Sequence, residues 1–411
     1  MFHATDDFDR QEVVAMKVRA AALLGVIALA ATGCGATSPA KQDTGPIVIG
    51  MPIALSGLAS GLDGPFHTGA QLAVDDINAS GGVLGRRLRI VSADAKSDPA
   101  QSATAAQTVI NQGAKFILPT VDYDLGGPAA RLAQSKGLVS MTLAGDPRFG
   151  MLGVGSLAFN IGSGGPTEGA SAASFAWSRG WRRPYLLEDT SLAYSQSFCQ
   201  FFRHSWKTIS GARAASIPSD SFLNGDPSIA SQITRLKAAR PRPDFVVLCS
   251  YPPGGAAAVK QLRAAGINVP VVGGVAFDGT FWLPTVPKER NFYAMGGGVI
   301  TGTDPEPMRA KVFSEYRAKT GKAPVNGIWA LSGYSSIQAL AKAITAAKST
   351  KSTAVAAQLE RFHDEPLAIG PTTWTAQCHV AVGRPTVVIR MDKGREAYTA
   401  TVTPKKIPQA C

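Results

Sequence analysis

The sequence predicts an α/β protein built from two doubly wound lobes, and three observations lead to that prediction. Short apolar runs typical of buried strands alternate with helix-like segments along most of the 411 residues. The strand-like runs are continuously apolar, which is typical of parallel sheets covered by helices on both faces. The chain is also longer than one domain usually needs, and its 45% hydrophobic content can supply more than one core.

The first strand–helix–strand unit is the clearest. The run "PIVIGM" at 46–51 predicts a buried strand. One face of the helix that follows carries Ala70, Ala73, Val74 and Ile77, which lie at positions i, i+3, i+4 and i+7. Gly81 and Gly82 are expected to end this helix, because glycine accepts the left-handed geometry of a helix exit. The next strand is expected at 88–91.

The same alternation predicts the later elements. Strands are expected at 116–118, 138–142, 185–187, 212–217, 244–248 and 270–272. Helices are expected to begin at Ala100 and Pro128 and to cover 195–209, 229–239, 256–265, 308–319 and 328–347. The tail at 372–402 predicts a β-hairpin that turns near Asp392. Ligands bind beyond the carboxyl ends of such strands, so the loops at 56–65, 119–127 and 143–148 are candidate binding loops.

The amino-terminal residues resemble an export signal rather than part of the fold. A basic stretch from Met16 to Arg19 precedes an apolar run from Ala20 to Ala31, which is too short to span a bilayer permanently. The run ends at Gly33-Cys34, which resembles a bacterial lipobox, although a plain secretory signal remains an alternative. We therefore expect 1–33 to be a leader, Cys34 to be lipidated, and 34–45 to tether the protein to the outer face of the cytoplasmic membrane.

The other cysteines also favour export. Cys199, Cys249, Cys378 and Cys411 form an even set, which in an oxidising compartment suggests two disulfides. Four cysteines allow three pairings. We favour Cys199 with Cys249 and Cys378 with Cys411, because each pair falls within one expected lobe.

The composition and the motifs argue against several classes of function. The net charge is +12, but Lys and Arg are scattered without a basic stripe, so nucleic-acid binding is not expected. The sequence contains no phosphate-binding glycine loop, nucleophile elbow or zinc-protease motif. Because His and Cys also lack metal-ligand spacing, we expect no catalytic residue, metal or cofactor.

Several stretches resemble type I solute-binding proteins, and in particular the branched-chain amino-acid-binding (leucine-binding) proteins of ABC importers. They are "GAQLAVDDINASGGVLGRRLRIVSADAKSDPAQSATAAQTVI", "WSRGWRRPYLLEDTSLAYSQS", "DPSIASQITRLKAARPRPDFVVLCSYPPGGAAAVKQLRAAGI" and "PVVGGVAFDGTF", in family order. The resemblance implies the type I periplasmic binding protein fold, with two Rossmann-like lobes joined by a three-strand hinge. We expect 46–160 plus 297–371 to form lobe 1 and 161–296 plus 372–411 to form lobe 2.

The resemblance also implies a ligand-binding set between the lobes: Asp122, Tyr123, Ala144, Gly145, Asp146, Tyr194, Tyr251 and Asp278. In the family, hydroxyl groups and helix-terminal N–H groups meet the α-carboxylate of the ligand. Here Asp122 and Asp146 occupy those loops, and two carboxylates would repel a third. A neutral amide, a polyol or a cationic solute would therefore fit better, unless these acids cap the following helices and face solvent.

The function implied is that of a lipid-anchored, extracytoplasmic solute-binding component of an ABC importer. We expect it to act as a monomer, to capture a small polar solute such as an amino acid or amide, and to deliver it to a permease. A sensory binding protein that signals to a membrane partner is the alternative. A secreted enzyme is less favoured, because no catalytic constellation is visible.

Overall fold

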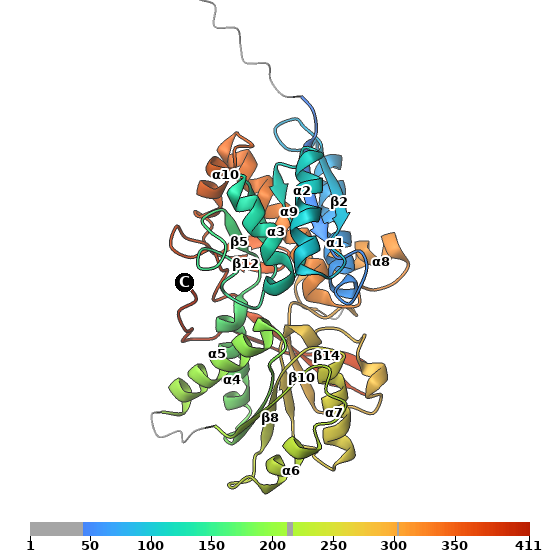
Figure 1. Ribbon diagram of the computed structural model, residues 1–411, viewed down its shortest axis with the longest axis vertical. Coiled ribbons are helices and arrows are strands. Elements are labelled where there is room, and N and C mark those ends of the chain that lie inside the picture. Colours follow the sequence, from blue (N-terminus) through green and yellow to red (C-terminus); the bar gives the residue numbers. More distant parts are fainter. Residues whose placement is uncertain (1–43, 212–216, 302–303) are drawn as a thin grey trace, which may run out of the picture. The chain divides into compact units, whose positions relative to one another are not determined.

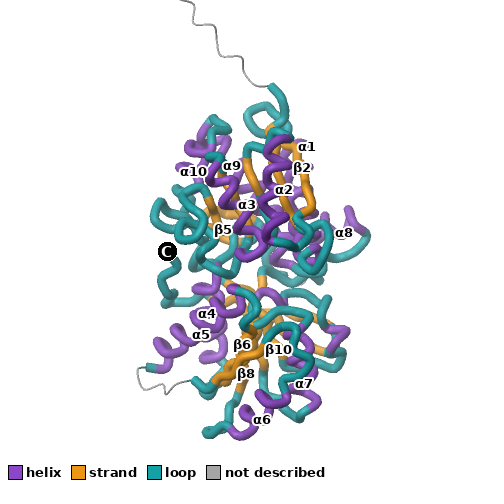
Figure 2. The backbone as a smooth tube through the Cα atoms, in the orientation of Figure 1, coloured by secondary structure: helices purple, strands orange, loops and turns teal. Residues whose placement is uncertain are grey.

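The computed structural model describes residues 44–211, 217–301 and 304–411, and shows two groups of elements, each built around a sheet (Figure 1). The expected leader, Cys34 and nearly all of the tether lie outside the described residues, as does most of the strand expected at 212–217. Figure 2 shows the strands of each group flanked by helices. The α/β fold class is therefore confirmed.

The first sheet has the order β2-β1-β3-β4-β5 within the described part of the chain, and all its pairings are parallel. Its strands are β1 (Ile47–Ile53), β2 (Leu88–Asp94), β3 (Phe116–Ile117), β4 (Val139–Thr142) and β5 (Ala158–Asn160). The helices of this group are α1 (Ser60–Ala79), α2 (Pro99–Asn111), α3 (Tyr123–Ser135), α8 (Pro307–Thr320), α9 (Gly327–Ala347) and α10 (Ser352–Leu359).

The second sheet has the order β14-β13-β10-β9-β8-β6-β7. Its strands are β6 (Pro184–Asp189), β7 (Ser219–Phe222), β8 (Phe245–Cys249), β9 (Val271–Gly273), β10 (Phe292–Gly296), β13 (Thr386–Asp392) and β14 (Arg395–Val402). Its helices are α4 (Gly164–Ser178), α5 (Ala193–Ser210), α6 (Ala230–Ala238) and α7 (Gly254–Ala264). The expected hairpin is confirmed, since β13 and β14 pair antiparallel to each other at one edge of the sheet. β13 also pairs antiparallel with β10, and the other pairings of this sheet are parallel.

Both sheets are buried on two faces, which explains why their strands are continuously apolar. In β1, Ile47 and Ile49 join one core cluster, whereas Val48 between them joins another. In β8, Val246 and Val247 divide between two clusters in the same way. Successive strand residues point to opposite faces, so a strand covered on both sides must be apolar at every position.

Three segments connect the two sheets. The chain leaves the first sheet between β5 and α4, returns between β10 and α8, and crosses again before β13. The third crossing follows a small sheet formed by β11 (Glu365–Leu367) and β12 (Gly370–Thr372). The expected three-strand hinge is thus present. The exact lobe boundaries stay predictions.

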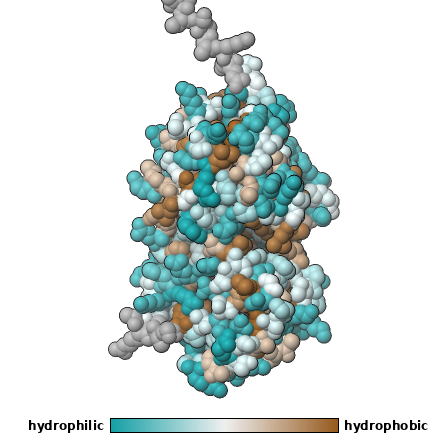
Figure 3. All heavy atoms as spheres, viewed as in Figure 1, coloured by the Kyte–Doolittle hydropathy of each residue, from teal (hydrophilic) through white to brown (hydrophobic). Residues whose placement is uncertain are grey.

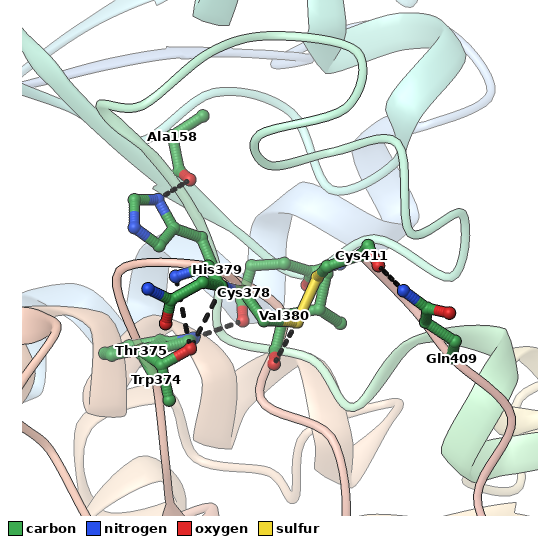
Figure 4. Close-up of a disulfide and its surroundings, with 10 residues drawn as sticks. Ala158, Trp374, Thr375, Cys378, His379, Val380, Gln409 and Cys411 are labelled. Carbon is green, nitrogen blue, oxygen red and sulfur yellow. Dashed lines mark hydrogen bonds between the residues drawn. A yellow bond between two sulfur atoms is a disulfide. The ribbon is translucent and has the colours of Figure 1, made fainter.

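The segment before β13 packs against β5. The Trp374 and His379 rings both contact Phe159, and Asn160 pairs with Val380. Figure 4 shows the neighbouring Cys378–Cys411 disulfide, which ties the carboxyl terminus to this segment. The second disulfide joins Cys199 of α5 to Cys249 of β8. Both favoured cysteine pairings are therefore found.

Two local expectations were wrong. The helix expected from Pro128 begins at Tyr123, because the Asp122 side chain caps its first turn and Pro128 is accommodated near its start. The sequence interpretation also omitted β5 and α4. Helix α4 is rich in small residues and buried on nearly all sides, so it lacks the polar face that marks a surface helix.

Candidate functional site

A cavity of about 580 Å³ lies between the two sheets, at the carboxyl ends of their strands. From the first group it is lined by residues that include Leu58, Leu62, Val121, Leu125 and Trp329. From the second group it is lined by residues that include Leu192, Tyr194, Tyr251, Phe281 and Trp282. Its volume is in the range of roughly 300–1,000 Å³ that is typical of small-molecule sites.

The walls of this cavity are mostly apolar. Apart from the two tyrosines, the polar side chains among its lining residues in the described chain are Ser97, Asp122 and Thr285, and no Lys, Arg or His lines it. Leu58 is 71% exposed, and Phe281 and Val325 are each 37% exposed. Figure 3 shows hydrophobic surface between the two groups of elements, at the right of the view. Exposed apolar patches of this kind often mark binding sites.

Asp122 lines the cavity at the start of α3. Its Oδ1 accepts hydrogen bonds from the backbone N–H groups of Asp124 at 2.7 Å and Leu125 at 3.2 Å. Burial, followed by the neighbouring Asp124, raises the pKa of Asp122 to about 7. The residue also has a φ of 146°, which is unusual for a side chain other than glycine. The carboxylate thus occupies the helix N-terminus that would otherwise attract an anion.

Tyr194 and Gly145 line the cavity and pack against each other. Gly145 follows β4, and a Cβ atom there would lie 2.1 Å from Cδ2 of the Tyr194 ring. The Tyr194 hydroxyl donates to Glu168 Oε1 at 3.0 Å and accepts from the N–H of Ala276 at 3.2 Å. Burial raises the pKa of Tyr194 well above its ordinary value, so the hydroxyl stays protonated. These contacts connect the first sheet, through Gly145, to three segments of the second group.

Tyr251 follows β8 and also lines the cavity. It is half-buried, and burial together with the charges of Asp189 and Asp122 raises its pKa to about 12. Its hydroxyl is therefore a neutral donor near neutral pH. Of the predicted set, Asp122, Gly145, Tyr194 and Tyr251 line this cavity.

The other predicted residues lie elsewhere. Asp146 does not line the cavity: its carboxylate pairs with the Arg148 guanidinium, at 3.0 Å from Nε and 2.6 Å from Nη2. The Tyr123 ring packs under the same guanidinium, 4.7 Å from its centre. The backbone of Ala144 bonds to the Asn160 side chain, and Ala144 borders a separate cavity of about 40 Å³ at the hinge.

Asp278 also has a structural role. Its Oδ2 accepts from the N–H groups of Gly297 and Ile328, each at 2.9 Å, which joins a hinge segment to the start of α9. Burial raises the pKa of Asp278 to about 7. The side chain is fully buried and does not line the larger cavity.

Two buried acids were not identified from the sequence. Glu168 of α4 accepts hydrogen bonds from the Tyr194 hydroxyl and from the N–H of Val275. Asp63 of α1 accepts from the N–H groups of Ala54 at 2.6 Å and Val121 at 2.9 Å, and so joins the loops after β1 and β3. Burial raises the pKa of both acids to about 7. An isolated acid within a run of small residues was the available signal for Glu168.

Neither a metal centre nor a membrane span is found in the part of the chain that the structure describes. No group of three or more His, Cys, Asp or Glu side chains there is arranged to hold a metal ion. No described helix is both long and apolar enough to cross a bilayer.

Comparison with known proteins places most of the folded region in one family. The family model described as periplasmic binding protein matches residues 46–396. The Leu/Ile/Val-binding protein BraC3 of Rhizobium johnstonii is 24% identical over 331 residues, which cover 80% of this chain and 87% of BraC3. The Leu/Ile/Val-binding protein of Escherichia coli K12 is 25% identical over 366 residues, which cover 87% of this chain and 93% of that protein.

Solved structures show the same fold. The branched-chain amino-acid transporter substrate-binding protein LivJ of Streptococcus pneumoniae, in complex with isoleucine, aligns with a TM-score of 0.75 at 22% identity, over 87% of this chain and 100% of LivJ. The leucine-binding protein LivK of Thermotoga maritima aligns with a TM-score of 0.76 at 20% identity, over 87% of this chain and 99% of LivK. The homologues are solute-binding proteins rather than enzymes, and the chain belongs to the periplasmic binding protein family.

Proposed function

We propose that this protein is the lipid-anchored, extracytoplasmic solute-binding component of an ABC importer, which holds a small solute between its lobes and delivers it to a permease. The main support for this proposal is the cavity, which is lined by residues from both groups of elements. A solute that touches both lobes favours the closed state by its differential affinity for that state. Closure can then signal to a permease that the protein is loaded.

Contacts between the two groups of elements support a closable cleft. Asp124 of α3 accepts a hydrogen bond from the N–H of Ala193 at 2.9 Å, and Phe281 packs against Trp329 with ring centres 5.9 Å apart. These contacts would have to break for the cleft to open, together with the hydrogen bonds that join Gly145 and α9 to the second group. The family is extracytoplasmic and works with ABC permeases, which agrees with this use of the cleft.

A pair of glycines in α1 allows a matched test. Gly61 lines the cavity and Gly64 does not, and a Cβ atom on either one would meet nothing within 4 Å. We expect Gly61→Trp to fill the cavity and abolish both solute binding and uptake, whereas Gly64→Trp retains both. Full-length protein in detergent would be examined by native mass spectrometry for a retained solute, and cells would be assayed for solute uptake. Binding without any dependence of uptake on the protein would contradict the importer role and favour the sensory alternative.

The anchor is tested separately. Cys34→Ala should move the protein from the membrane fraction to the soluble fraction, because acyl chains on Cys34 would provide its hold on the bilayer. Membrane fractionation, with mass spectrometry of the mature amino terminus, checks this expectation. A variant that stays in the membrane would contradict lipidation at Cys34 without affecting the solute-binding role.

A further inference from the structure

Carboxylates of the protein itself occupy three helix N-termini near the cavity, whereas the starts of α1 and α7, which also border it, have no side-chain cap. Asp122 caps α3, Asp124 accepts from the first residue of α5, and Asp278 accepts from the first turn of α9. Free helix N-termini attract anions because their N–H groups and the helix dipole favour negative charge. With these three termini capped, each of those positions offers a ligand carboxylate a like charge instead of free donors.

The cavity lining offers no compensating cation. Within the described chain, its lining residues include no Lys, Arg or His, and their one charged side chain is Asp122. A ligand carboxylate here would lose much of its hydration beside an acid, and both effects oppose its binding. A zwitterionic amino acid carries the same carboxylate and meets the same penalty.

The polar groups that remain suit a nitrogen donor. Asp122 uses Oδ1 for both of its backbone hydrogen bonds, and its Oδ2 makes no hydrogen bond to any described residue. The Tyr251 hydroxyl lies close enough for the charge of Asp122 to act on it. The acid can accept from an ammonium or amide N–H, and the neutral hydroxyl can donate to an amide carbonyl. A charge-assisted hydrogen bond to the acid is worth more than a neutral one.

The remaining walls suit a bulky apolar body. Leu58 and Val325 from the first group and Phe281 and Trp282 from the second group line the same cavity. Leu58, Val325 and Phe281 keep large parts of their side chains exposed. Covering this surface stabilises a complex in proportion to the apolar area removed from water. A small, fully polar solute would leave most of that apolar surface exposed to water.

From these observations we propose that the cleft takes a solute with a bulky apolar body and an amine or amide nitrogen at its polar end, and that it discriminates against carboxylates. This inference rests on the proposed function, since it names the solute class for the same cavity. Asp122 is the residue that sets the preference, and the apolar walls supply most of the affinity.

Three probes that share one phenyl-propyl framework test the polar end: 3-phenylpropylamine, 3-phenylpropionamide and 3-phenylpropionate. L-Leucine tests the zwitterion. Calorimetry on the full-length protein in detergent at about pH 8, where Asp122 is mostly ionised, should show amine and amide binding at least about tenfold tighter than carboxylate and leucine. Tighter binding of the carboxylate or of leucine would overturn the inference, as would failure of both nitrogen probes to bind.

Asp122→Asn isolates the charge. Asparagine keeps the side-chain oxygen that caps α3, so the helix should remain while the negative charge is lost. The amine should lose about tenfold in affinity, and the gap between amide and carboxylate should narrow. Asp98→Asn is the control, because the Asp98 side chain also caps a helix, α2, by accepting from the N–H of Gln101, but it is exposed and does not line the cavity. Equal losses in both variants would contradict a specific role for Asp122.

Gly61→Trp separates this inference from the proposed function. If carboxylate or leucine binds and Gly61→Trp abolishes that binding, the cleft is the solute site and only the nitrogen preference is wrong. If a probe binds Gly61→Trp as tightly as it binds the wild type, the binding lies outside the cleft and the proposed site is wrong as well.

Discussion

The loops that follow β3 and β4 each carry an aspartate close behind a buried strand, yet the two acids lie in different surroundings. Asp122 lines the cleft and caps α3. Asp146, in the next loop, turns to Arg148 and does not line the cleft. Gly145 beside it makes the close contact with Tyr194 that Asp146 does not make.

The difference shows that proximity to a strand end does not by itself place a side chain in the cleft. Arg148 lies two residues after Asp146, within reach of a bidentate ion pair, and the Tyr123 ring covers the guanidinium. Asp122 has no such neighbour and instead meets the free N–H groups of its own helix. Local partners therefore decide which acid remains available to a ligand.

Of the substitutions in these two loops, Gly145→Ala is expected to have the largest effect on stability and on solute binding. The added methyl group would overlap the Tyr194 ring, which must move and thereby loosen its bonds to Glu168 and Ala276. We expect a loss of about 1–3 kcal/mol in the free energy of unfolding. Binding of the amide probe should fall as well. Urea unfolding and calorimetry check both expectations, with Gly64→Ala as the control that leaves binding unchanged. Unaltered binding in Gly145→Ala would show that Tyr194 does not shape the cleft.

The next largest effect on stability is expected from removing the Asp122 cap of α3. Asp122→Ala should lower the free energy of unfolding by about 1 kcal/mol through loss of the cap. Asp122→Gly should cost less, because glycine adopts the φ of 146° without strain. Urea unfolding of the two variants gives the comparison. If Asp122→Ala lowered the free energy of unfolding less than Asp122→Gly does, the positive φ at this position would not restrict which residue can stand there.

The contribution of Asp122 to the free energy of unfolding is also expected to depend on pH. Burial raises its pKa from 3.8 to about 7, so its contribution to stability is present below about pH 4 and is lost as the pH rises through 7. The stability of the wild type relative to Asp122→Asn should therefore decrease between these values. Unfolding at several pH values measures the difference, and a gap that widens with pH would contradict the expected sign.

The smallest effect on solute affinity is expected from Asp146→Asn. The Arg148 side chain of the ion pair is 52% exposed but that of Asp146 is only 6% exposed. Because asparagine keeps an oxygen that can accept from Arg148, we expect a loss of about 1 kcal/mol in the free energy of unfolding. Solute affinity should change less than about threefold, since the acid does not line the cavity. Calorimetry with the amide probe measures this change in affinity. A loss comparable to that of Asp122→Asn would mean that Asp146 turns to the solute when the cleft closes.

The sequence by itself determined the class of fold and the order of most elements, and it favoured the two disulfide pairings that the structure shows. Continuous apolar strands such as β1 and β8 can be buried only in a sheet covered on both faces, and Gly81-Gly82 can only be an exit from a helix or a turn, so local chemistry was sufficient there. Helix α4 escaped notice because its residues are small and buried all round, which leaves no periodic signal.

The make-up of the site was decided by the tertiary structure. Leu58, Phe281 and Trp329 come from distant parts of the chain, and no local pattern shows that they share one cavity. Asp146 pairs with Arg148, and Asp278 accepts a hydrogen bond from the start of α9. The sequence around each acid does not show which partner it takes. A carboxylate is stabilised by whichever donors the fold brings within about 3 Å, and that choice is made in three dimensions.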